Sequence, residues 1–196
     1  MGKGYSLAIA MLVLSTCLIA ESFEQHHRQE AHTHGLAEIT LAIEGDEVDV
    51  ELQSPAANIV GFEHIASTPE QRGLVDKASL ILKSPNKLFS FFGTSCELKA
   101  SEIDISDLLG DEVHGSEENG HDHLAHDKLG HETHSEVSAN YQFYCEQGPK
   151  LTAITLNFLE YFSGIETLHI AWVTDNHQGS VELTDGSNTV YLREIP

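Results

Sequence analysis

The stretch from Gly35 to Leu52, GLAEITLAIEGDEVDVEL, holds the clearest structural pattern in the chain. Apolar residues occupy alternate positions on both sides of a Gly45-Asp46 pair, namely Ala37, Ile39, Leu41, Ile43, Val48, Val50 and Leu52. Because successive side chains of a strand point to opposite faces, this alternation predicts two strands that each bury one face. A Gly-Asp pair between two such runs is typical of a tight turn. The stretch therefore predicts an antiparallel hairpin at the start of a β-rich domain.

The best helix signal begins at Thr68, which is a good N-cap residue. Pro69 stands at the first helical position, and Gln71 completes a capping box. Five apolar residues then recur at helical spacing and form one stripe: Leu74, Val75, Ala78, Ile81 and Leu82. Ser84-Pro85 ends the pattern, because the residue before a proline disfavours helical geometry. We therefore expect one main helix.

Alternating and β-branched runs predict further strands. These strands are expected over residues 96–105, 137–145, 151–159, 166–173, 180–183 and 189–192. Cys96, Leu98 and Ala100 should share one face, and the last two strands should form a hairpin around Asp185-Gly186. The aromatic run 88–92 is expected to pack on the core. The fold class that follows is α+β, mostly antiparallel, with one main helix and a long insertion.

The insertion from Asp107 to Glu136 contains nine acidic residues, one lysine and no aromatic residue, so it should be disordered. Its six histidines are His114, His121, His123, His126, His131 and His134. Imidazole binds zinc, copper and nickel well, and the HDH and HETH runs give overlapping sets of ligands. We therefore expect several weak, exchanging metal sites here. The alternative is a solvated acidic linker, against which the six histidines argue.

Length and charge limit the partners that this protein can have. The chain has 196 residues and a formal net charge of -21, which suits one domain with an insertion. Nucleic acids and anionic membrane surfaces repel such a protein, whereas cations are attracted to it. Divalent metal ions are therefore the expected ligands.

The N-terminus predicts export. Lys3 precedes an apolar run from Leu7 to Ala20 that is too short for a membrane span and has the length of a signal-peptide core. We expect residues 1–22 to be a cleaved signal peptide, residues 23–31 a flexible leader and residues 32–196 a single metal-binding domain without membrane insertion. The alternatives are an uncleaved anchor or lipidation at Cys17.

Cleavage would leave two cysteines, Cys96 and Cys145. Two cysteines in an exported chain are most simply one disulfide, which we expect to clamp the base of the insertion. Metal ligation by the thiolates is the alternative. It is disfavoured because neither cysteine belongs to a CxxC pair.

Histidines outside the insertion are candidates for an ordered metal site. His32 and His34 form an HxH pair just before the first strand, and His64 lies in a loop beside Glu63, which could bind metal or orient the imidazole. The alternatives are a solvated leader and a structural, hydrogen-bonded His64. His169 should lie on the outer face of a strand and His177 in a solvated turn.

Catalysis finds little support in the sequence. GxSxG, HExxH and phosphate-binding glycine motifs are absent, so we expect no enzymatic activity. An enzyme with a zinc-bound water would need three protein ligands and an open position beside a substrate pocket.

Several motifs together resemble the ZrgA family over roughly residues 31–192. They are His32-Thr33-His34-Gly35, Ser54-Pro55-Ala56-Ala57-Asn58, Gly61-Phe62-Glu63-His64, Thr68-Pro69-Glu70-Gln71, the 141–145 strand and Phe162-Ser163-Gly164-Ile165-Glu166. Members of this family usually have a proline where Ser163 stands, which affects a turn and no ligand.

The resemblance implies a periplasmic zinc-binding accessory protein of Gram-negative bacteria that works with an ABC-type zinc importer or its substrate-binding protein. Carried over by motif, His32, His34 and His64 are the implied ordered ligands, with zinc as the expected metal and other divalent transition metals as further candidates. The alternative function is a metal buffer or zinc/copper-tolerance protein that never delivers its metal.

Overall fold

The structure is a computed structural model that describes residues 33–110 and 135–192. These residues are mostly strands with few helices, which agrees with the predicted α+β class. The expected signal peptide, leader and most of the insertion lie outside the described residues. Among the described residues, no helix is both long and apolar enough to cross a membrane.

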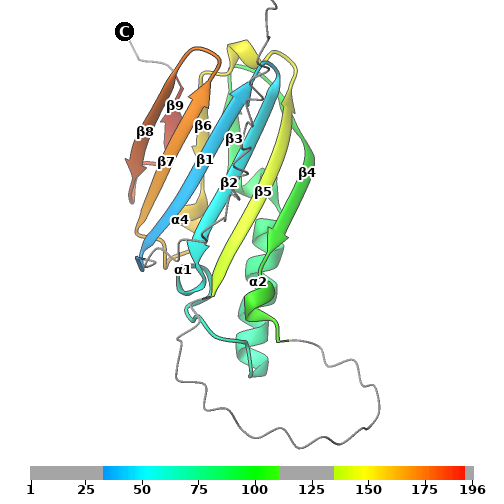
Figure 1. The fold of residues 1–196 in the computed structure, drawn as a ribbon, viewed down its shortest axis with the longest axis vertical. Coiled ribbons are helices and arrows are strands. Elements are labelled where there is room, and N and C mark those ends of the chain that lie inside the picture. Colours follow the sequence, from blue (N-terminus) through cyan, green and yellow to red (C-terminus); the bar gives the residue numbers. More distant parts are fainter. Residues whose placement is uncertain (1–32, 111–134, 193–196) are drawn as a thin grey trace, which may run out of the picture. The chain divides into compact units, whose positions relative to one another are not determined.

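A six-stranded sheet forms one layer of the domain (Figure 1). Its strands, in spatial order, are β4 (Cys96–Asp104), β5 (Glu136–Cys145), β2 (Glu47–Pro55), β1 (Leu36–Glu44), β7 (Thr167–Thr174) and β8 (Gln178–Leu183). All neighbours are antiparallel except β1 and β7. The predicted hairpin is confirmed, with Leu41 opposite Val50 across β1 and β2.

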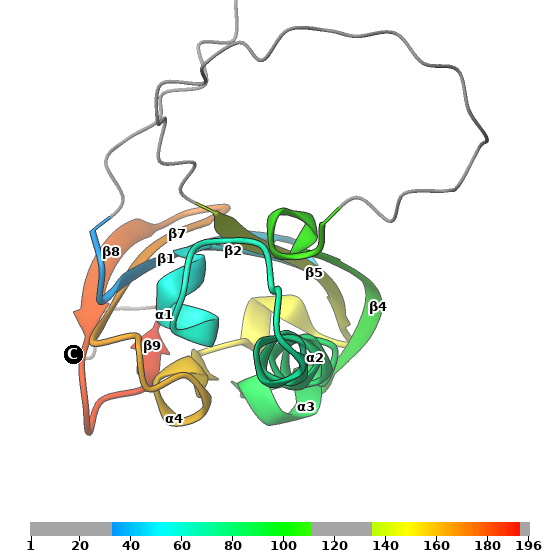
Figure 2. The same ribbon diagram turned by 90° about the horizontal axis from the view of Figure 1, so that it is seen from below.

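The second layer covers the inner face of this sheet (Figure 2). It consists of a three-stranded sheet, β3 (Phe89–Phe92), β6 (Ala153–Leu156) and β9 (Thr189–Tyr191), and four helices, α1 (Ala56–Val60), α2 (Pro69–Leu82), α3 (Pro85–Leu88) and α4 (Phe158–Tyr161). Between the layers, Phe89 packs edge-on against Tyr141 and Phe143 of β5, with ring centroids 4.9 and 5.2 Å apart. The alternate apolar residues of β1, β2 and β5 are buried against this layer, as their spacing predicts.

The outer face of the large sheet is rich in carboxylates, and no described element covers it (Figure 2). The exposed acids on this face are Glu38, Glu44, Glu47, Asp49, Glu51, Glu97, Glu102, Asp104 and Glu182. The predicted position of His169 is confirmed, because Leu168 and Ile170 are buried while His169 lies on this face beside Glu38.

Helix α2 begins with the predicted capping box. The Thr68 hydroxyl accepts a hydrogen bond from the Gln71 backbone N–H, and the Gln71 side chain accepts one from the Thr68 backbone N–H. Four of the five residues in the predicted stripe are buried, but Leu74 is 47% exposed. This exposed leucine lines a cleft between α1 and α2.

The predicted hairpin over residues 180–192 is wrong. Strand β8 pairs with β7 in the large sheet, whereas β9 pairs with β6 in the small sheet. A turn signal at Asp185-Gly186 predicts that the chain reverses, but it does not determine which strand becomes the partner. The run 151–159 is also not one strand, since β6 ends at Leu156 and Phe158 begins α4. The run 88–92 packs on the core as predicted, as the end of α3 followed by β3.

The predicted face of Ala100 in β4 is also wrong. Leu98 lies opposite Phe143 on the inner side, but a register shift between Leu98 and Ala100 places Ala100 opposite Gln142 on the outer side. A bulge adds one residue to a strand and thereby reverses the alternation of its side chains.

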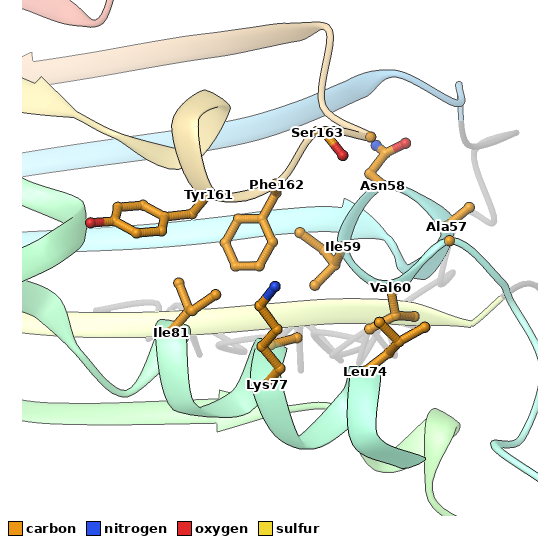
Figure 3. Close-up of a pocket in the computed structure, with 13 residues that line it drawn as sticks. Ala57, Asn58, Ile59, Val60, Leu74, Lys77, Ile81, Tyr161, Phe162 and Ser163 are labelled. Atoms are coloured by element: carbon orange, nitrogen blue, oxygen red, sulfur yellow. The ribbon is translucent and has the colours of Figure 1, made fainter. Parts of the chain in front are cut away.

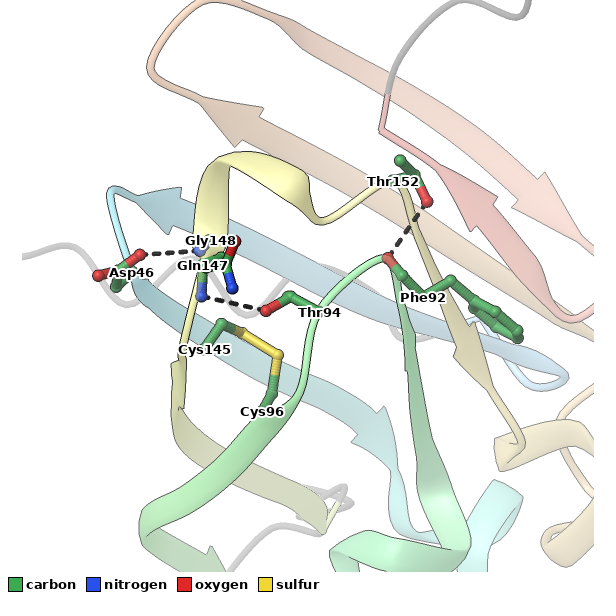
Figure 4. The surroundings of a disulfide bond; sticks show 8 residues. All are labelled: Asp46, Phe92, Thr94, Cys96, Cys145, Gln147, Gly148 and Thr152. Atoms are coloured by element: carbon green, nitrogen blue, oxygen red, sulfur yellow. Dashed lines mark hydrogen bonds between the residues drawn. A yellow bond between two sulfur atoms is a disulfide. The ribbon is translucent and has the colours of Figure 1, made fainter.

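The disulfide between Cys96 and Cys145 is present, with a Cα–Cα distance of 4.0 Å, but it does not clamp the base of the insertion. Cys96 begins β4 and Cys145 ends β5, so the bond (Figure 4) lies at the end of this strand pair opposite to Asp104 and Glu136, where the described ends of the insertion are attached (Figure 1). Hydrogen bonds fix the surrounding turns: the Gln147 N–H donates to Thr94 Oγ1 at 3.1 Å, and the Gly148 N–H donates to Asp46 Oδ1 at 2.8 Å.

Candidate metal centre

The candidate site lies at the opposite end of the large sheet, where β1 and β5 begin and β2 and β4 end (Figure 1). His34 and the loop that contains Glu63 and His64 meet at this end. His32 and the six insertion histidines lie outside the described residues, so their positions relative to this site are not described.

The central contact joins His34 to Glu63. Nε2 of the imidazole lies 2.9 Å from Oε1 of the carboxylate, across 29 residues of sequence. The His34 side chain is 66% exposed, whereas that of Glu63 is only 14% exposed. A nitrogen and an oxygen ligand of the types that zinc prefers are therefore already in contact at the surface.

Asn58 positions the backbone of His34. Its buried side-chain oxygen accepts a hydrogen bond from the Gly35 N–H at 2.8 Å. Its side-chain nitrogen donates to the backbone carbonyl of Leu36 at 2.8 Å and to Ser54 Oγ at 3.2 Å. The turn at Gly35 has a φ of 85°, a conformation that favours glycine. The local sequence thus holds His34 at a fixed turn rather than in a free leader.

Glu166 is an acidic residue beside Gly35 that sequence reasoning did not single out as a ligand. Its backbone N–H donates to the Gly35 carbonyl at 2.7 Å. Its carboxylate oxygen lies 3.3 Å from the position that a Cβ atom on Gly35 would occupy. The available signal was its place at the end of the Phe162-to-Glu166 motif, since nothing local connects this residue with His34.

His64 has a different environment. Its Nε2 lies 2.9 Å from Nε2 of Gln71, and its ring lies 4.9 Å from that of Phe62. Since Oε1 of Gln71 accepts hydrogen bonds from the N–H groups of Ser67 and Thr68, the Gln71 amide nitrogen faces His64 and donates to it. This is the arrangement of a structural histidine, and coordination of zinc by Nε2 would require Gln71 to release that atom.

Both described ends of the insertion are attached to the loop that carries Glu63. The Ala66 N–H donates a hydrogen bond to the carbonyl of Leu108 at 2.9 Å. The side chain of Leu108 is fully buried. On the returning side, the Ser135 hydroxyl donates to the Glu63 carbonyl at 3.1 Å. The polypeptide therefore leaves and re-enters the domain beside the His34–Glu63 contact, and hydrogen bonds rather than the disulfide fix this base.

Two further predicted candidates do not join this contact. His169 Nδ1 lies 3.8 Å from Glu38 Oε1 on the outer sheet face, and His177 lies in the turn after β7, at the other end of the sheet. Within residues 33–110 and 135–192, no three His, Cys, Asp or Glu side chains are grouped so that they could hold a metal ion. What the described residues supply is thus a pair of candidate ligand groups, with the Glu166 carboxylate beside Gly35.

The sequence also matches a known protein family. A family model described as "ZrgA family zinc uptake protein" matches residues 31–192, which is most of the chain. No curated protein matches the sequence.

Proposed function

Because the chain belongs to the ZrgA family of zinc uptake proteins, we propose that it is a periplasmic protein that collects zinc and supports a high-affinity uptake system. The proposed role is binding and transfer of the metal, without catalysis. An ABC-type zinc importer or its substrate-binding protein is the proposed recipient.

The His34–Glu63 contact is the observation that carries this proposal. Zinc is bound by imidazole nitrogen and carboxylate oxygen, commonly with four ligands in total. The pair provides two of these, and Glu166, which lies beside Gly35, and His32, two residues before His34, are the proposed further ligands. Because the buried amide of Asn58 fixes the turn at Gly35, binding of zinc by this pair needs little ordering of the backbone.

The insertion would act as the collecting element. Its six histidines offer weak, exchanging sites, and its acidic residues raise the local concentration of cations. Its attachment points at Leu108 and Ser135 lie on the loop of Glu63, which supports transfer from the insertion to the ordered pair over a short path. Since zinc requires neutral imidazole, affinity should fall steeply below about pH 6.

The proposal is tested by zinc titration calorimetry on the mature protein, with residues 111–134 replaced by a short Gly/Ser linker. His34→Ala and Glu63→Gln should each weaken one tight site by at least about tenfold. His177→Ala is the matched control, because that histidine is exposed and lies at the other end of the sheet. Unchanged affinity in both site variants, with folding verified by circular dichroism, would place the ordered site elsewhere.

Growth of a deletion strain separates this function from that of a buffer. An uptake factor predicts poor growth when zinc is scarce, whereas a buffer or tolerance protein predicts poor growth when zinc or copper is in excess.

A further inference from the structure

A second surface feature lies among the helices rather than at the candidate metal centre. A cleft of about 310 Å³ separates α1 from α2 and from the chain that follows α4 (Figure 3). Its exposed lining is polar and apolar in about equal parts, and the apolar residues include Ile59, Val60, Leu74, Ile81 and Phe162. Leu74 is 47% exposed at the edge of the cleft, although the helical stripe predicts that it is buried. Val60, Ile81 and Phe162 are buried, so Leu74 is the exposed apolar side chain that the described lining offers to a partner.

Lys77 is the one charged side chain among the residues that line the cleft. In Figure 3 it extends from α2 toward the opposite wall, with its ammonium group near Phe162. Within the described part of the chain, no carboxylate lies within ion-pair distance of Lys77, although the sequence contains 31 acidic residues. An exposed cation beside an exposed leucine matches an occupant that carries both an apolar side chain and a negative charge.

We propose that this cleft is the docking site for a short amphipathic segment of a partner protein. The segment would place apolar side chains between α1 and α2 and would present a carboxylate to Lys77. The open shape favours a protein segment over a small molecule, because small-molecule sites enclose most of the surface of their ligand. The outer face of the large sheet is unsuitable for the same occupant, since its carboxylates would repel the negative charge.

The position of the cleft gives docking a functional consequence. Helix α1 is five residues long and forms one wall of the cleft. Its Asn58 holds the turn at Gly35, and its C-terminal residue is followed by the loop that contains Glu63. A docked segment would therefore lie one short helix away from the His34–Glu63 pair. The inference does not require zinc to be bound, so its failure would leave the proposed zinc function standing.

The test is an NMR titration of the isotope-labelled mature protein with two synthetic helical peptides. Both peptides carry two leucines four residues apart. They differ at a single position, one helical turn from the leucines, which is glutamate in the first peptide and lysine in the second. The glutamate peptide should bind saturably and shift the signals of α1, α2 and the 161–164 segment. Lys77→Glu should weaken this binding by about fivefold or more and should make the lysine peptide the better ligand.

Lys83→Glu is the matched control, because this lysine follows the end of α2 and does not line the cleft. It should leave the binding of both peptides within about twofold of the original, apart from general charge effects. Leu74→Asp should abolish binding through the apolar wall and provides a second, independent variant. Absence of saturable shifts at the cleft would overturn the proposal, and so would equal binding to the Lys77→Glu variant. Binding of decanoate at the cleft without binding of either peptide would also overturn it, in favour of a small amphiphile.

Discussion

The two ends of the large sheet are held in different ways. At one end, which we call the disulfide end, Cys96 and Cys145 join β4 to β5 covalently, and the Gly148 N–H is bonded to Asp46 across the neighbouring turn. At the other, which we call the insertion end, the same two strands separate. There the chain is held by a hydrogen bond that Asn58 accepts from Gly35 and by hydrogen bonds that Ala66 and Ser135 donate.

This difference separates stability from ligand binding. The disulfide restricts the unfolded chain wherever it lies in the fold, so it can stabilise the domain from the end that carries no candidate ligand. The candidate ligand pair, His34 and Glu63, instead occurs where loops leave a rigid sheet, which is where binding residues commonly lie. The consequence is that damage to one end should affect folding and damage to the other should affect metal affinity.

The largest expected effect tests the disulfide end. Replacing both cysteines by serine should lower the free energy of unfolding by about 4 kcal/mol, because the bond closes a loop with a sequence separation of 49 residues. Urea denaturation of the two proteins gives this difference directly. In the fraction that remains folded, zinc affinity should stay within about twofold, because the bond lies far from His34 and Glu63. A large loss of affinity at full folding would show that the two ends are coupled.

A smaller effect tests the insertion end by comparing two deletions. Replacing residues 111–134 by a short linker should leave the free energy of unfolding nearly unchanged and reduce the number of zinc ions bound. Removing residues 107–136 also takes away the fully buried Leu108 and the bonded Ser135, and should cost about 3 kcal/mol or more. Thermal unfolding of both proteins measures the difference. Equal stabilities would mean that these residues do not fix the base of the insertion.

The smallest expected effect concerns Asp104, the last residue of β4 at the insertion end. Its Oδ1 accepts a hydrogen bond from the Ser106 N–H at 2.9 Å, and this bond lowers the pKa of its carboxyl below the usual value. A lowered folded-state pKa means that the stabilisation is present above the unfolded value of about 3.9 and is lost as the pH falls through the folded value. Asp104→Asn should therefore reduce the loss of stability on acidification, by well under about 1 kcal/mol because the group is exposed. If the free energy of unfolding fell equally in the two proteins as the pH was lowered, the stabilising role of the Asp104–Ser106 hydrogen bond would be contradicted.

Local patterns predicted the parts of the fold that depend on neighbours in sequence. Alternation gave the faces of β1 and β2, and the Thr68–Gln71 box gave the start of α2. The same kind of pattern failed at Ala100, where a bulge reverses the alternation, and at residues 180–192, where the two strands join different sheets. In both cases the deciding contact is with a strand that lies far away in the sequence.

The sequence by itself determined the chemistry that is available: an acidic chain, histidines in an insertion, an HxHG motif and two cysteines. It also determined the family, because the motifs are recognisable without any structure. Only the tertiary structure decided that His34 meets Glu63, that Glu166 lies beside Gly35 and that the disulfide is remote from the base of the insertion. Residue types and short periodicities depend only on residues that are close together in the sequence. These contacts depend instead on how the strands pair, and that pairing minimises the free energy of the whole buried core.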